Sequence, residues 1–253
     1  MDQPHSITHQ ILALVEEIAK NLGKIEGLGL IRVAPHLRKQ NKVRTIHSTL
    51  VIEGNRLTRE QVTSIIEGKP VIGPRKDIIE VENAIEVYKV FTALDPMSEV
   101  SFKKAHSILM QGLLKADSGQ YRKQNFGVGD HIAPAFTLVP THMQNLFASL
   151  KKSAESLLIK SCIFHYETEF IHPFIDGNGR MGRLWQSLLL YKVDSVFASV
   201  PVENFVKDHQ SEYYKVLRQC DQAGNSTLFI EFMLELINQG LKEFLPQKIS
   251  LSD

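Results

Sequence analysis

Hydrophobic residues recur every three or four positions along most of the chain, which is the spacing of an amphipathic α-helix. The first such stripe predicts a helix beginning after Ser6, its expected N-cap, and consists of Ile7, Ile11, Leu14, Ile18, Leu22 and Ile25. Similar patterns predict helices over residues 39–53, 58–66, 77–94, 101–114 and 143–170. Glycine and proline residues separate these segments, as at Gly54 and Pro70, and such residues end helices.

One region departs from the helical pattern. Residues 125–140 combine glycines and prolines with valine, isoleucine, phenylalanine and leucine, which predicts a short hairpin or an irregular loop. Strands and helices do not alternate along the chain, and no internal repeat is visible. The pattern therefore predicts an all-α helical bundle with one short β-hairpin.

Composition narrows the class of protein. The chain has 253 residues, 43% of them hydrophobic, which is enough for the core of one large domain or two small ones. A net charge of +1 gives no broad attraction to nucleic acid or to a membrane surface. Cys162 and Cys220 are the two cysteines, too few for a disulfide framework or a zinc ribbon. The N-terminus has no secretory signal and no apolar run is long enough to span a bilayer, so we expect a soluble cytoplasmic protein.

The highest concentration of residues suited to catalysis or ligand binding lies between His172 and Arg183, in the sequence HPFIDGNGRMGR. Glycines allow backbone N–H groups to approach phosphate oxygens, and the N-terminus of a following helix favours the same anion. Arginine neutralises phosphate charge, a carboxylate such as Asp176 can hold Mg²⁺, and a neutral imidazole can accept a proton from a hydroxyl. Together these residue types are suited to binding a polyphosphate.

This segment resembles the signature of the Fic family, H-P-F-x-[D/E]-G-N-G-R-x-x-R, and every fixed position is present. Members of that family transfer AMP from ATP to a hydroxyl of a target protein. The resemblance implies a Fic-fold helical bundle and a protein adenylyltransferase that uses ATP and Mg²⁺ and modifies a Ser, Thr or Tyr side chain. It also implies a helical region over 1–95, a core domain over 96–241 and a short tail over 242–253.

The resemblance gives each residue of the segment a role. His172 becomes the general base and Asp176 the Mg²⁺ ligand. The nucleotide would be bound by Gly177, Asn178, Gly179, Arg180, Met181, Gly182 and Arg183, with Tyr214 against adenine. The residues alone leave simpler roles open. These are a helix-end histidine, an N-cap at Asp176 and a solvated basic face for the two arginines.

Two further features of the family have counterparts in this chain. The stretch from Val128 and Gly129 to Leu138 matches the family's flap, which pairs with the backbone of a target at a strand edge. The inhibitory pattern [S/T]-x-x-x-E-[G/N] fits residues 49–54 and fits 63–68 equally well. We favour the first copy because the residues after it are closer to the family's sequence. We therefore expect Thr49 and Glu53 to be regulatory, with Glu53 pairing with Arg183 where the γ-phosphate would lie.

Several alternatives compete with AMP transfer. The same site could remove AMP from a modified protein, transfer a phosphate as Doc toxins do, or belong to an interaction module without activity. The segment also matches the dinucleotide pattern G-x-G-x-x-G, but no buried strand precedes it, so we reject that reading. Modification of the protein itself and assembly into a homodimer are both left open.

Overall fold

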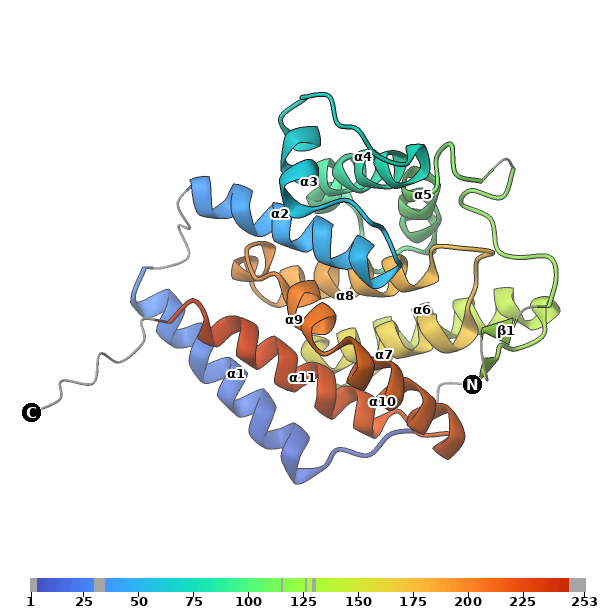
Figure 1. Ribbon diagram of the computed structural model, residues 1–253. Helices are drawn as coiled ribbons and strands as arrows, with labels where there is room; N and C mark the ends of the chain where they lie inside the picture. Colours follow the sequence, from blue (N-terminus) through green and yellow to red (C-terminus); the bar gives the residue numbers. More distant parts are fainter. Residues whose placement is uncertain (1–3, 30–34, 115, 126, 129–130, 246–253) are drawn as a thin grey trace, which may run out of the picture.

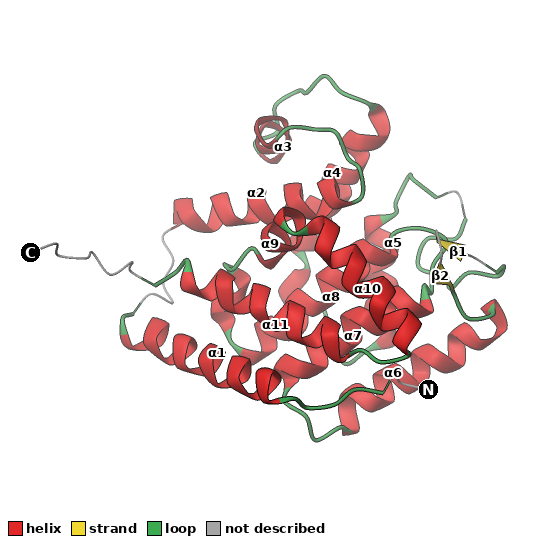
Figure 2. Ribbon diagram, turned by 60° about the horizontal axis from the view of Figure 1, so that its bottom comes forward, coloured by secondary structure: helices red, strands yellow, loops and turns green. Residues whose placement is uncertain are grey.

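The computed structural model describes residues 4–29, 35–114, 116–125, 127–128 and 131–245, and these form an all-α helical bundle (Figures 1 and 2). Eleven α-helices lie within this part of the chain. Their bounds are α1 His9–Gly27, α2 Pro35–Ile52, α3 Arg59–Ile66, α4 Arg75–Lys89, α5 Glu99–Leu109, α6 Val139–Lys152, α7 Leu157–Ile171, α8 Asn178–Val193, α9 Val202–Asp208, α10 Gln210–Ala223 and α11 Thr227–Lys242. Three short 3-10 helices, η1 Phe91–Ala93, η2 Phe136–Leu138 and η3 Ser195–Ala198, connect some of them.

Helices α7 and α8 form the centre of the bundle (Figure 1). Most residues of α8 are buried, including Trp185, whose indole nitrogen donates to the carbonyl of Pro96 at 2.9 Å. A Cβ atom on Gly182 would lie 2.7 Å from the ring of His165 on α7. The two helices can therefore approach this closely only because residue 182 has no side chain.

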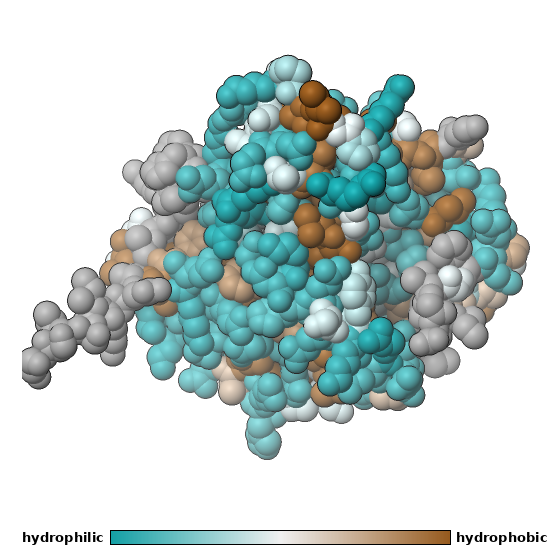
Figure 3. Space-filling view, in the orientation of Figure 1, coloured by the Kyte–Doolittle hydropathy of each residue, from teal (hydrophilic) through white to brown (hydrophobic). Residues whose placement is uncertain are grey.

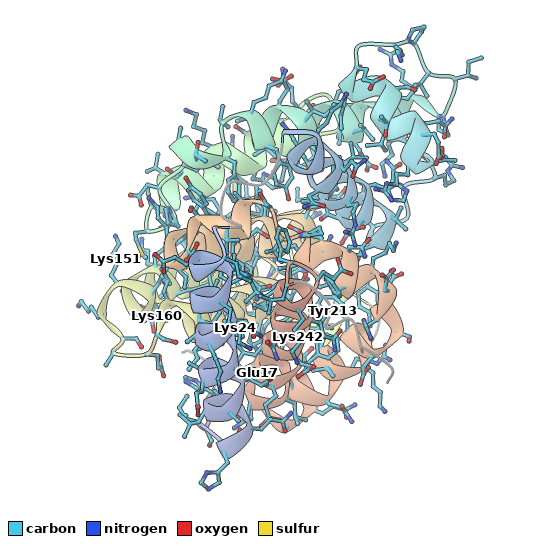
Figure 4. All side chains as sticks on the ribbon, turned by 90° about the vertical axis from the view of Figure 1, so that its left-hand side faces the viewer. Glu17, Lys24, Lys151, Lys160, Tyr213 and Lys242 are labelled. Atoms are coloured by element: carbon cyan, nitrogen blue, oxygen red, sulfur yellow. The ribbon has the colours of Figure 1, made fainter. Side chains whose placement is uncertain are left out.

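The first helix packs against the last one, on the face shown in Figure 4. Helix α1 buries one apolar stripe against α11, as its sequence pattern predicts. Asn21 donates to Asn238 at 2.9 Å, and Lys242 forms an ion pair with Glu17 at 2.9 Å. The predicted N-cap was wrong by two residues, because Thr8 rather than Ser6 accepts the hydrogen bond from the first turn.

The helical pattern over residues 143–170 belongs to two helices, α6 and α7, and not to one. Helix α6 ends at Lys152, and Ser156 then caps α7 by accepting from the backbone N–H of Ile159. Serine competes for backbone hydrogen bonds and favours such caps. The apolar period continues on both sides of the break, so periodicity alone could not reveal it.

The predicted hairpin region contains two strands of two residues each, β1 Gly127–Val128 and β2 His131–Ile132, paired antiparallel. Gly127 pairs with Ile132 and Val128 with His131. Gly129, which we assigned to the flap, lies outside the described residues. The role of this segment in binding a target remains a prediction.

Hydrophilic residues cover most of the face seen in Figure 3, with small hydrophobic patches between them. Among the described residues, no helix combines the length and the hydropathy that crossing a bilayer requires.

The close approach of α7 and α8 gives a test of the fold. We expect Gly182→Ala to destabilise the protein by about 1–3 kcal/mol, because His165 is buried and held by two hydrogen bonds, and overpacking a core costs this much. Gly23→Ala on α1 is the matched control. No atom lies within 4 Å of its new Cβ, so it should stabilise α1 by about 0.5–1 kcal/mol. Denaturant unfolding measures both, and equal stability of the two variants would contradict the close approach.

Candidate active site

His172 lies at the end of α7, as predicted, in a left-handed backbone conformation with φ 49°. It is the one non-glycine residue with positive φ in the described part of the chain, and this conformation costs about 1–2 kcal/mol. Arg122, buried at 2% exposure, holds the turn by donating to the carbonyls of His172 and Pro134. The backbone conformation therefore fixes the direction in which the imidazole side chain leaves the chain. Arg122, which lies far from His172 in sequence, stabilises this strained residue.

The loop after His172 is closed by Asn178. Its side chain both accepts from the backbone N–H of Phe174 at 2.8 Å and donates to the carbonyl of the same residue at 2.9 Å. Phe174 is fully buried and stacks on His106 with ring centroids 3.6 Å apart. Asn178 thus shapes the loop from within, in addition to any contact with a ligand.

Asp176 is not the N-cap of α8, which removes the simpler role considered for it. The cap is Gly177, with φ 85° and no capping side chain. The carboxylate of Asp176 is about half exposed, at 47%, and accepts from the backbone of Gly177 at 2.6 Å and from Arg180 at 3.2 Å. Its remaining oxygen surface faces outward, where a cation could reach it.

Arg180 is buried at 4% exposure, which excludes the solvated basic face. Its guanidinium contacts Asp176 at 3.2 Å and Glu80 of α4 at 3.4 Å. Its Nε is buried and meets no acceptor among the described residues. A buried donor without an acceptor is costly, and Arg180 carries this cost beside its contacts with Asp176 and Glu80.

Arg183 is buried at 2% exposure and is held by the end of α2. Its Nε donates to the hydroxyl of Thr49 at 3.0 Å, and its Nη2 donates to the Thr49 carbonyl at 3.1 Å and to Glu53 Oε1 at 2.6 Å. Burial lowers the pKa of Arg183, but the charge and hydrogen bond of Glu53, together with Tyr213 and Glu169, more than offset it, so the pKa is raised. The structure thus brings the predicted regulatory residues onto the predicted arginine.

The position of Glu53 follows from how α2 ends. Asn55 N–H donates to the carbonyl of Leu50, and Gly54 N–H donates to that of Val51, which is the Schellman pattern of a helix C-terminus. Gly54 has φ 85°, a conformation that glycine adopts without strain. Glu53 is consequently the last residue before the turn, one helical turn after Thr49, so both side chains reach Arg183.

The second copy of the inhibitory pattern ends elsewhere. Glu67 is bound by Lys39 at 2.8 Å and by Lys69 at 2.7 Å, and these two lysines lower its pKa to about 2. The geometry therefore separates two copies that the motif alone could not, because only the first copy contacts the arginine segment among the described residues.

Gly179 lies directly beneath the carboxylate of Glu53. A Cβ atom at this position would be 2.5 Å from Glu53 Oε1 and 3.2 Å from an oxygen of Glu169. The first backbone N–H groups of a helix lack intrahelical acceptors and favour negative charge. Glu53 thus places a carboxylate over the N-terminus of α8, where the motif predicts phosphate.

A polar network beside Arg183 was not predicted from the sequence. Glu169 accepts from the hydroxyl of Tyr213 at 3.1 Å, and that hydroxyl lies 3.0 Å from His165 (Tyr213 is labelled in Figure 4). Burial would raise the pKa of Glu169, but its contact with His165 and the charges of His165, Arg183 and His172 hold it at about 2. The spacing of His165 and Glu169, four residues on one helix, was the available signal.

The remaining predicted residues lie near the site but make other contacts. Met181 is fully buried in the core, and Gly182 packs against α7. Tyr214 is 38% exposed and donates to the carbonyl of Ile52 at 3.4 Å, beside the end of α2. Their predicted contacts with a nucleotide stay predictions.

At this site, phosphate groups and water molecules would supply most of the ligands of a magnesium ion. No cluster of three or more His, Cys, Asp or Glu suited to a metal occurs in the described ranges. Mg²⁺ bound with phosphates commonly uses one or two carboxylates and several waters, and the outward-facing Asp176 fits that arrangement.

The low pKa of Glu169 gives a test of the network. A carboxylate whose pKa is lowered on folding stabilises the protein above its unfolded pKa, near 4.5, and loses that contribution as the pH falls toward about 2. Between pH 5 and pH 3, the unfolding free energy of wild type should fall by about 1–3 kcal/mol more than that of Glu169→Gln. Urea unfolding across this range measures it, with Glu16→Gln on the exposed face of α1 as control. An unchanged slope in Glu169→Gln would contradict the assignment.

Comparison with known proteins identifies the family. The model of the Fic/DOC family matches residues 96–190. A Fic family protein from Desulfovibrio desulfuricans is 42% identical and superposes with a TM-score of 0.91, covering 96% of this chain and 76% of that one. Fic-1 from C. elegans has the same fold, with a TM-score of 0.74 at 17% identity, over 93% of this chain and 70% of that one.

Curated relatives are more distant. A protein adenylyltransferase Fic from Nematostella vectensis is 28% identical over 215 residues, and one from Drosophila ananassae is 25% identical over 219 residues. They cover 79% and 82% of this chain but only 48% and 42% of their own lengths, so the chain spans less than half of the curated relatives it matches. Through its motif, its fold and its similarity to the bacterial structure, the chain belongs to the Fic/DOC family.

Proposed function

We propose that this protein is a protein adenylyltransferase that uses Mg-ATP and is inhibited by the end of its own helix α2. One observation carries the proposal: a carboxylate of the chain lies over the N-terminus of α8 and binds Arg183 at 2.6 Å. A site that attracts an internal anion to a helix N-terminus and a buried guanidinium is suited to a phosphate group.

In the proposed reaction, His172 accepts the proton of a Ser, Thr or Tyr hydroxyl of the target protein. The hydroxyl oxygen forms a bond to the α-phosphorus of ATP while the bond to the β-phosphate oxygen breaks, and pyrophosphate leaves. Positioning and charge neutralisation contribute most of the acceleration in such phosphate transfers.

Each motif residue has a task in this scheme. Gly177, Asn178 and Gly179 present backbone N–H groups to the α- and β-phosphates, Arg180 binds the β-phosphate side, and Arg183 binds the γ-phosphate. Asp176 would hold Mg²⁺, which supplies positive charge between the phosphates. Met181 and Gly182 keep the start of α8 in place, and Tyr214 contacts adenine once it releases Ile52.

The protein target would pair with the backbone at Val128 and Gly129. Backbone pairing fixes the position of a hydroxyl but reads little side-chain sequence. The proposal therefore defines the target as a protein with an accessible hydroxyl residue, which includes the enzyme itself.

Inhibition follows from competition for Arg183. While Glu53 and Thr49 occupy the guanidinium, the γ-phosphate cannot bind it in the same geometry. A displaced triphosphate is poorly aligned for in-line attack, and misalignment of this kind reduces rates by orders of magnitude.

Labelled ATP tests the reaction directly. Incubation of the Glu53→Gly variant in a cell lysate with ATP labelled at the α-phosphate should transfer label to protein, and ATP labelled at the γ-phosphate should not. Transfer of γ-label would mean phosphorylation instead, and no transfer of either label would point to removal of AMP or to an interaction module. His172→Ala should abolish the α-label if the imidazole is the base.

We expect Glu53→Gly to raise AMP transfer at least about tenfold, because it frees Arg183 and the space above Gly179. Glu67→Gly is the matched control, since Glu67 contacts lysines and not the arginine segment. Initial rates of α-label incorporation measure both. Equal rates for wild type and Glu53→Gly would refute the inhibitory role while leaving the reaction itself untouched.

The turn at Gly54 gives a graded version of this test. Gly54→Ala puts a Cβ at φ 85°, which strains the helix end by about 1 kcal/mol. The activity should then lie between those of wild type and Glu53→Gly. Gly68→Ala repeats the change at φ 71° after α3 and should leave the rate unchanged. Activation by both alanines, or by neither, would disprove the link between the turn and inhibition.

A further inference from the structure

A cavity lies outside the motif segment, between α2, α4, η1, α8, η3 and the start of α9. Its volume is about 240 Å³. An apolar cavity of about 150 Å³ can hold benzene, so this one has room for a molecule of two fused rings. None of its lining residues comes from the loop between α7 and α8.

Glu203 supplies the main polar group of this cavity. It is 2% exposed, and its Oε1 accepts from the hydroxyls of Ser187 at 2.7 Å and Tyr88 at 3.2 Å. No lysine, arginine or histidine in the described part of the chain forms an ion pair with it, and burial raises its pKa. A buried carboxyl group is stabilised by a cation or by a further hydrogen-bond donor.

Aromatic rings form the apolar walls. Tyr88 and Phe91 stack with centroids 5.7 Å apart and an interplanar angle of 19°, and Phe197 contributes a third ring. Flat ring faces favour a planar ligand and attract an ammonium group. Lys42 also lines the cavity but is partly exposed, so solvent screens its charge more than that of Glu203.

Two of the helices that line the cavity, α2 and α8, also form the contact between Glu53 and Arg183. Thr45 lines it one helical turn before Thr49 on α2, and Ser187 lines it one turn after Arg183 on α8. Helices α2, α8 and α9 lie together here (Figure 1). A molecule between Thr45 and Ser187 would contact both helices that form the inhibitory contact.

We propose that this cavity binds a small aromatic amine, with the amine on Glu203 and the rings against Tyr88, Phe91 and Phe197, and that binding stabilises the docked position of α2. The ligand binds only the state in which the cavity exists, so it stabilises that state by mass action. The regulatory consequence rests on the proposed inhibition by Glu53, whereas the binding site does not.

Tryptamine is the probe for binding, and indole-3-propionate, which carries a carboxylate on a similar ring, is its matched control. At about ten times its Kd, tryptamine should raise the Tm by about 3–6 °C, and calorimetry should detect binding at millimolar concentration or tighter. Indole-3-propionate should bind at least about tenfold more weakly, because Glu203 repels it. Failure of tryptamine to bind, or equal binding of both compounds, would overturn the proposal.

Two variants locate the site. Glu203→Gln removes the charge, and Thr45→Phe fills the cavity from α2; each should weaken tryptamine binding at least about tenfold. Glu86→Gln, an exposed carboxylate on the same helix as Tyr88, should not alter it. Circular dichroism verifies that the variants fold. Unchanged affinity in a folded Glu203→Gln or Thr45→Phe protein would exclude this cavity as the site.

Hydrogen exchange tests the coupling to α2 independently of activity. Tryptamine should slow amide exchange over residues 39–53 in wild type but not in Glu203→Gln. If α2 exchange is unchanged while tryptamine binds, the coupling is wrong. If tryptamine binds and slows exchange while no variant transfers AMP, the proposed function fails and the binding site stands.

Discussion

The buried guanidinium of Arg183 is the group on which the rest of this structure depends. A charge at 2% exposure is tolerable only with partners, and among the described residues the guanidinium donates its hydrogen bonds to Thr49 and Glu53 at one helix end. That requirement ties α2, which lies far away in sequence, to the start of α8. The chain thereby supplies an anion where its motif is suited to accept one from a nucleotide.

Much of this arrangement could be predicted from the sequence because it is local. The helical periods, the motif from His172 to Arg183 and the glycine that ends α2 all act within a few residues, and the structure contains each of them. The break between α6 and α7 was missed because the apolar period continues across it. The cap at Thr8 was missed because Ser6 and Thr8 are chemically alike.

Apart from the pairing of Glu53 with Arg183, which the family resemblance implied, the pairings between distant segments could not be predicted. Glu80 reaches Arg180 across 100 positions, and Arg122 reaches the carbonyl of His172 across 50. The contact that distinguishes Glu53 from Glu67 depends on where each helix ends in space, whereas both copies match the same short pattern. Charge and spacing alone do not specify which carboxylate meets which arginine.

The glycine at position 182 has a wider consequence. Because residue 182 has no side chain, α7 and α8 can touch. This contact keeps His172, at the end of α7, beside Arg180 and Arg183, at the start of α8. The helix end that carries Glu53 and the short strand pair lie in other parts of the chain. Under the proposed function, inhibition and target binding therefore depend on segments other than α7 and α8, and substitutions in those segments can leave the contact between α7 and α8 intact.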